Sequence, residues 1–97
     1  MMNITKKLPK EIKEIWVEAL RSGEFTQGQM SLHPTETTDC CIGVLGKVIF
    51  AENYHTGGPY EYLDETTGFK TTHRLYDMND CQGKSFSEIA DWIEENL

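Results

Sequence analysis

The sequence predicts a single α+β domain in which two or three helices pack on a small antiparallel sheet. Apolar residues recur at helical spacing near both ends of the chain, and residues 60–75 contain two strand-like runs on either side of a glycine turn. A chain of 97 residues has room for one hydrophobic core. We therefore expect residues 1–97 to form one domain.

The first helix is predicted between Leu8 and Ser22. Its apolar side chains share one face, formed by Leu8, Ile12, Ile15, Trp16, Ala19 and Leu20. Pro9 suits the first turn, where its missing N–H donor costs nothing, and Gly23 can adopt the left-handed conformation that ends a helix. Both ends of this helix are thus marked in the sequence.

The apolar run from Asp39 to Ala51 is expected to be the most buried segment. Its β-branched residues favour a strand, whereas its length and an N-cap at Asp39 favour a helix. We expect a helix, in which Gly43 and Gly46 each lower helix propensity by roughly 1 kcal/mol relative to alanine.

A β-hairpin is predicted between Tyr60 and Leu75. Tyr60 and Tyr62 precede the turn at residues 66–68, and residues 69–75 follow it. The short segment at residues 30–33 is expected to pair with this hairpin and complete the sheet.

The last helix is predicted to begin at Ser85. Ser85 and Glu88 have the spacing of a capping box, in which each residue bonds the backbone N–H of the other. The apolar face is formed by Phe86, Ile89, Ala90, Ile93 and Leu97.

Sixteen acidic and nine basic side chains give a formal net charge of −7. Such a charge repels nucleic acid and anionic membranes at long range, so we expect neither a nucleic-acid-coating protein nor a membrane-surface protein. A local basic site can still bind one small anion, because salt screens distant carboxylates beyond about 8–10 Å.

No stretch has the length of a signal peptide or a membrane span, so we expect a cytoplasmic protein. Three cysteines are an odd number, and reduced thiols are the default without export. The spacings Cys-x-x-Cys and His-x-x-x-His are absent, so no metal and no cofactor are expected.

The adjacent Cys40 and Cys41 allow two interpretations. A thiol in the first turn of a helix has a lowered pKa, so Cys41 or Cys40, with His73 as base and Asp77 or Asn79 as its orienting group, would form the catalytic set of a hydrolase. Alternatively, both cysteines are small core residues, since free cysteine is among the most buried residue types. We favour packing, and no catalytic residue is expected.

Ligand-binding residues are sought among polar, basic and aromatic side chains near predicted turns. Tyrosines can stack on a nucleobase, basic groups on the hairpin can bind an anion, and polar groups crowd the start of the last helix, where anions are favoured. The alternative for this last group is an ordinary capped turn. The candidates are Gln27, Tyr60, Tyr62, Lys70, Arg74, Asn79 and Asp80.

Three blocks of sequence together resemble a family of small proteins of unknown function from bacteriophage and prophage genomes. The blocks are WVEALRSGEFTQGQMSL at 16–32, CCIGVL at 40–45 and LYDMNDCQGKSFSEIADWIEENL at 75–97. The matching polar residues are Gln27, Cys40, Cys41, Asn79, Asp80, Ser85 and Glu88, and the histidines lie outside the blocks. The resemblance implies no reaction, but its genomic setting implies a protein that acts by binding, often against host defence.

We therefore expect a phage-encoded binding protein, not an enzyme, that antagonises bacterial defence. It would sequester a nucleotide second messenger or occlude a host defence protein, and a homo-oligomer is one way to complete a ligand pocket. The alternatives are the cysteine-dependent hydrolase and an acidic nucleic-acid mimic whose carboxylates occupy a basic groove.

Overall fold

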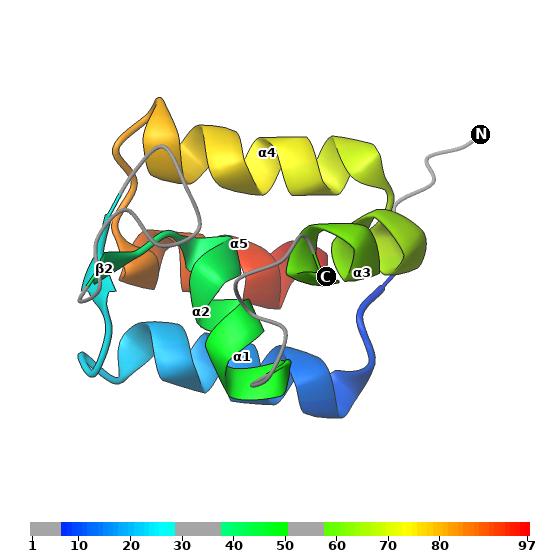
Figure 1. Ribbon diagram of the computed structural model, residues 1–97, viewed down its shortest axis with the longest axis horizontal. Coiled ribbons are helices and arrows are strands. Elements are labelled where there is room, and N and C mark those ends of the chain that lie inside the picture. The colour runs from blue at the N-terminus through cyan, green and yellow to red at the C-terminus, as the bar shows by residue number, and fades with distance from the viewer. Residues whose placement is uncertain (1–6, 29–37, 51–57) are drawn as a thin grey trace.

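The computed structural model describes residues 7–28, 38–50 and 58–97, which form five helices (Figure 1). They are α1 (Lys10–Arg21), α2 (Cys41–Ile49), α3 (Gly58–Thr67), α4 (Phe69–Asp80) and α5 (Phe86–Asn96). Two-residue strands β1 (Thr26–Gln27) and β2 (Thr38–Asp39) pair in parallel. The described part of the chain is thus a helical bundle, and the predicted α+β fold with an antiparallel sheet is wrong.

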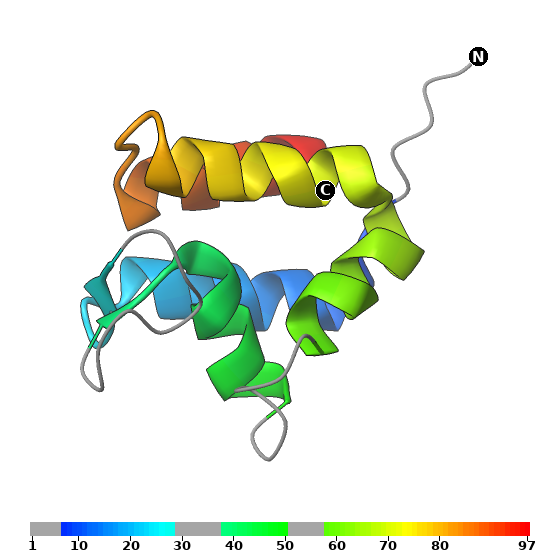
Figure 2. The same ribbon diagram turned by 45° about the horizontal axis from the view of Figure 1, so that its top comes forward.

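The helices α1, α5 and α4 run lengthwise, with neighbouring helices antiparallel, and α2 crosses them (Figures 1 and 2). Their core is formed by Trp16, Ile42, Leu45, Leu75, Ile89 and Ile93, all fully buried. The indole N–H of Trp16 donates to the Cys41 carbonyl at 2.9 Å, which fixes α1 against the start of α2. Leu8 N–H donates to the Leu97 carbonyl at 3.1 Å and ties the start of α1 to the end of α5.

The segment predicted as a β-hairpin, with Tyr60 and Tyr62 before its turn, folds as α3 and α4. The buried side chains of α4 follow helical spacing: Thr71, Thr72, Leu75, Met78 and Asn79. Three of these five are polar, so the apolar pattern did not reveal the helix. Gly68, with φ of 96°, separates two helices instead of forming a hairpin turn. The strand predicted at residues 30–33 lies outside the described residues.

The other helix predictions are confirmed, with two differences in detail. Gly23 has the left-handed φ of 80° expected after α1, but Ile15 is 45% exposed and Val17 takes its place in the core. The N-cap of α2 is Cys40, whose sulfur accepts a bond from Gly43 N–H at 3.4 Å, and not Asp39. None of the helices in the described ranges is long and apolar enough to cross a membrane.

The predicted capping box of α5 is also confirmed. Glu88 N–H donates to Ser85 Oγ at 3.1 Å, and Ser85 N–H donates to Glu88 Oε1 at 3.0 Å. The bond from the Ser85 backbone holds the pKa of the Glu88 carboxyl below its usual value. The start of α5 is therefore fixed locally, before tertiary packing.

Replacing Ser85 with alanine should lower the free energy of unfolding by about 1 kcal/mol, because the α5 N-terminus loses its side-chain acceptor. Urea denaturation followed by circular dichroism measures this change. Ser87→Ala, at an exposed position of the same helix, is the matched control and should change stability by less than about 0.5 kcal/mol. Equal effects of the two substitutions would contradict the capping assignment.

Candidate functional site

Asn79, at the end of α4, is the centre of a buried polar cluster. Its Oδ1 accepts bonds from Cys41 N–H at 3.2 Å and Gln27 Nε2 at 2.9 Å. Its Nδ2 donates to the Gly28 carbonyl and the Asp80 carboxylate, both at 2.8 Å. The predicted ligand-binding residues Gln27, Asn79 and Asp80 therefore lie together, bonded to one another and to the backbone.

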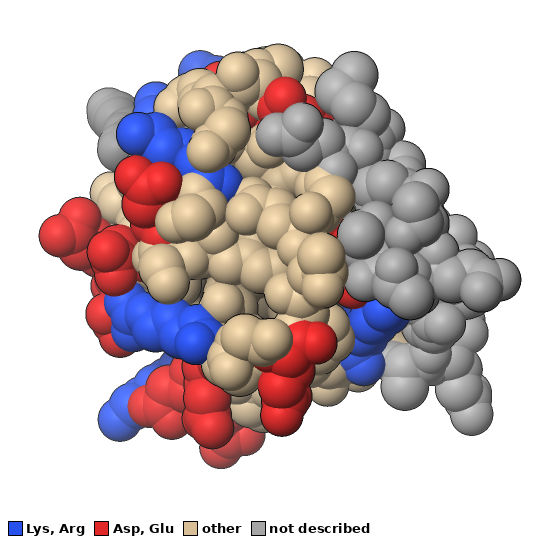
Figure 3. All heavy atoms as spheres, turned by 90° about the vertical axis from the view of Figure 1, so that its left-hand side faces the viewer, with Lys and Arg blue, Asp and Glu red and all other residues tan. Residues whose placement is uncertain are grey.

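Gln27 connects this cluster to the turn that precedes α5. Its Nε2 also donates to the Lys84 carbonyl at 2.7 Å. Next to it, Gly28 N–H donates to the Asp39 carbonyl at 2.7 Å and continues the pairing of β1 with β2. Four segments that are distant in sequence thus meet at one end of the bundle, namely β1, β2, the start of α2 and the α4–α5 turn. Figure 3 views this end, where uncharged residues form the middle of the described surface.

Cys40 and Cys41 are packed into the core at the start of α2. Both are buried, and Cys41 Sγ donates to the Leu75 carbonyl at 3.6 Å. Burial raises the pKa of the Cys40 thiol above its usual value and that of Cys41 well above it. Because the thiolate is the nucleophile, this environment opposes nucleophilic catalysis by either residue.

His73 and Asp77 lie one turn apart on the outer side of α4. The His73 side chain is exposed, and its ring meets that of Tyr76 edge-on, with 4.8 Å between centroids. Asp77 accepts a bond from Gln82 Nε2 at 2.8 Å, which holds the pKa of the Asp77 carboxyl below its usual value. The structure therefore leaves the base at the surface and the Cys41 thiol in the core, and it does not assemble the hydrolase set.

The two tyrosines among the predicted ligand-binding residues are half-buried on α3. The Tyr62 ring packs edge-on against Phe50 at the end of α2, with 5.3 Å between centroids. Burial raises the pKa of the Tyr60 hydroxyl well above its usual value. Both rings pack against the hydrophobic core, so neither offers a fully open stacking surface.

Lys70 and Arg74 lie one turn apart on the exposed side of α4, closer to its start than Asn79 is. The Arg74 guanidinium lies 5.8 Å from the ring centre of Trp92 on α5. Phe69, at the first position of α4, is 69% exposed and is not among the predicted ligand-binding residues. The predicted ligand-binding residues thus occupy three places: the Asn79 cluster, the inner part of α3 and the outer face of α4.

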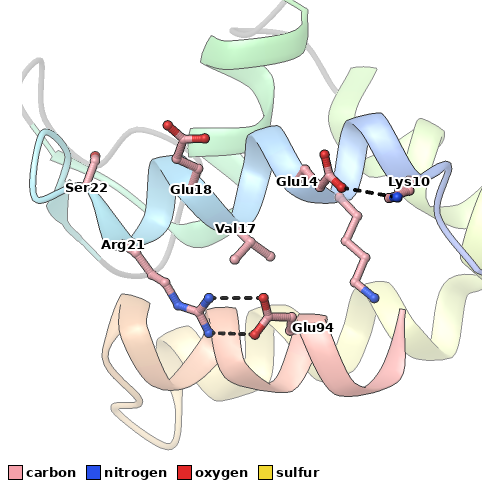
Figure 4. A pocket seen from close by; sticks show the side chains of 8 residues that line it. Lys10, Glu14, Val17, Glu18, Arg21, Ser22 and Glu94 are labelled. Carbon is pink, nitrogen blue, oxygen red and sulfur yellow. Dashed lines mark hydrogen bonds and ion pairs between the residues drawn. The ribbon is translucent and has the colours of Figure 1, made fainter.

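A hollow follows α1 where it lies against α5 (Figure 4). It is lined by Lys10, Lys13, Glu14, Val17, Glu18, Arg21, Ser22 and Glu94. Arg21 donates to both oxygens of Glu94, at 3.2 and 3.1 Å, and also binds Asp91. Three cations and three carboxylates line the hollow, so their charges balance and favour neither an anionic nor a cationic ligand.

Asp39 and Lys47 form a largely buried ion pair between β2 and α2. The two groups are 3.1 Å apart, with 1% of the Asp39 side chain and 28% of the Lys47 side chain exposed. The Lys47 ammonium also lies 6.0 Å from the ring centre of Phe25. Within the described ranges, no group of three His, Cys, Asp or Glu side chains is placed to hold a metal ion.

The chain belongs to a family defined as a domain of unknown function (DUF8296), whose model matches residues 8–72. The match covers α1, both strands, α2, α3 and the first residues of α4, and it ends before Asn79. No curated protein and no solved structure matches the chain. Family membership therefore brings no reaction or ligand with it.

Replacing Asn79 with alanine should lower the free energy of unfolding by about 3 kcal/mol. The substitution removes four hydrogen bonds among the described residues, including the one from the buried Cys41 N–H, and leaving a buried group unpaired costs roughly 1–3 kcal/mol. Asn96→Ala is the matched control, because Asn96 Nδ2 donates to the Trp92 carbonyl of its own helix and so joins no distant segment there, and it should cost less than about 1 kcal/mol. Denaturant titration separates the two, and a similar loss in both variants would show that Asn79 does not join the segments as described.

Alkylation should distinguish the three thiols. Cys81 is exposed, but a hydrogen bond with Asp77 raises the pKa of its thiol, so it should react alone and slowly in the folded protein. Cys40 and Cys41 should react only as the chain unfolds, and all three thiols in concentrated guanidinium chloride. Cys81→Ser should abolish the native reaction. Rapid alkylation of Cys40 or Cys41 in the folded protein would contradict this prediction and support the hydrolase hypothesis.

Proposed function

We propose that this member of the DUF8296 family is a phage-encoded binding protein that antagonises bacterial defence without catalysis. It would sequester a nucleotide signal or occlude a defence protein. The proposal that the protein acts without catalysis rests on the burial of Cys40 and Cys41, the two thiols that the sequence analysis considered as nucleophiles. The phage setting rests on the three sequence blocks described above.

The polar residues that could have formed an active site support the same proposal. Catalysis requires groups that reach a substrate, whereas the amides of Gln27 and Asn79 are bonded to the protein itself. Cys81 is the exposed thiol, but its raised pKa makes it a weak nucleophile.

An acidic nucleic-acid mimic is less well supported. Such a protein needs the carboxylates of the last helix and those of Asp64 and Glu65 to form one acidic surface that complements a basic groove. Arg21 of α1 binds both Asp91 and Glu94 of α5, so a cation interrupts the acidic surface where α1 meets α5. The proposal therefore keeps to the nucleotide signal and the defence protein.

The purified protein should bind its ligand and release it unchanged. A thermal-shift screen against cyclic dinucleotides, cyclic trinucleotides and cyclic ADP-ribose isomers tests the nucleotide arm, because ligand at 100 times its dissociation constant adds about 2.7 kcal/mol of stability. Chromatography after heat release should recover the ligand intact, and conversion to product would identify an enzyme.

The alternative, binding to a defence protein, is tested by exposing the immobilised protein to bacterial lysate. If no nucleotide shifts the melting temperature and no bacterial protein is retained, the proposal fails.

A further inference from the structure

The outer face of α4 carries two adjacent rows of side chains. Residues at i, i+4 and i+7 lie above one another on a helix, and neighbouring rows are in contact. One row is aromatic and contains Phe69, His73 and Tyr76. The other contains the cations Lys70 and Arg74.

The aromatic and cationic rows are accessible and continue onto α5. Phe69 is 69% exposed, Lys70, His73 and Arg74 are exposed, and Tyr76 is half-buried. Figure 2 shows α4 in front of α5, with the two helices side by side. Because the Arg74 guanidinium lies 5.8 Å from the Trp92 ring centre, aromatic groups border the cationic row on both sides.

The charge of this face is opposite to that of its surroundings. Lys70 and Arg74 are the only Lys or Arg residues between positions 48 and 83 of a chain with a net charge of −7. The exposed side of α3 instead carries Glu61, Asp64 and Glu65. The positive potential is therefore local, and salt screens the surrounding carboxylates beyond about 8–10 Å.

We propose that the outer face of α4 binds a short nucleotide, with its phosphates on Lys70 and Arg74 and its bases stacked on Phe69 and Trp92. This inference rests on the nucleotide arm of the proposed function. Cations bind phosphate through charge-assisted hydrogen bonds, and aromatic rings bind bases without sequence preference.

The ligand is short because of what lies beyond the cations. Asp77 is the next residue in the cationic row and ends its positive charge one turn after Arg74. A long single strand that left the face would meet the carboxylates of α3 and α5, and repulsion would oppose its binding. A dinucleotide can keep its phosphates next to the two cations.

Tryptophan fluorescence reports on this face directly. Trp16 is fully buried, whereas Trp92 is partly exposed under Arg74, so a ligand stacked there should quench Trp92 selectively. The probes are a cyclic diguanylate, its linear dinucleotide and a single-stranded oligothymidylate. Saturable quenching by a dinucleotide is expected, and Trp92→Phe should remove the signal.

Charge-neutralising variants locate the binding. Lys70→Gln/Arg74→Gln should weaken dinucleotide binding about tenfold or more, since both phosphate contacts are lost. Lys10→Gln/Lys13→Gln removes the same two charges from α1 and should change affinity less than about twofold. Phe69→Ala should weaken binding without changing the net charge.

Absence of quenching by either dinucleotide at millimolar concentration would overturn this inference. Equal affinities of the two double variants would overturn it as well, and oligothymidylate that binds more tightly than the dinucleotides would replace the short ligand with single-stranded nucleic acid. A thermal shift that persists in Lys70→Gln/Arg74→Gln would place the ligand elsewhere. That last result would leave the proposed function intact, so the two failures are distinguishable.

Discussion

The architecture depends on one buried amide, that of Asn79. Its oxygen accepts bonds from α2 and β1, and its nitrogen donates to Gly28, the residue after β1, and to Asp80. Few side chains both donate and accept in this way: a carboxylate only accepts, and an apolar residue does neither. Because buried polar groups must be paired, this amide determines how the short strands meet the helices.

The helices that could be predicted from sequence are those whose own residues determine them. Apolar spacing in α1 and the capping box of Ser85 and Glu88 act over a few residues, so local reasoning finds them. In α3 and α4, threonines take several inward positions. Thr66 and Thr67 donate their hydroxyls to carbonyls four residues earlier in α3, so they can face inward without another partner. The amphipathic pattern there is weak, and tertiary packing selects the helix.

The candidate site could be predicted only in part, for a similar reason. Lys70 and Arg74 share a face in a strand as well as in a helix, because a spacing of four suits both periods. Tyr76, seven positions after Phe69, joins that aromatic residue only in a helix. The shared face of the two cations could therefore be predicted despite the wrong fold class, whereas the aromatic row could not. The meeting of Gln27 with Asn79, 52 positions apart, is a tertiary property that no local pattern contains.

The extent of the family match also has a structural meaning. Residues 8–72 include α1 but not α5, the helix against which α1 packs. A chain cut at residue 72 would lose α5, the helix against which α1 packs, and would also lose the Asn79 amide. The folding unit in this protein is therefore longer than the segment that the family model matches.

The bond between Leu8 and Leu97 places two positions at opposite ends of the described chain in contact. The backbone thus returns, at the end of α5, to the point where α1 begins. A short linker could therefore join these positions. New N- and C-termini could then be placed at an exposed connection such as Gln82–Gly83 without rearranging the helices. A circularly permuted chain of this kind would keep every helix and its packing partners while changing their order along the sequence.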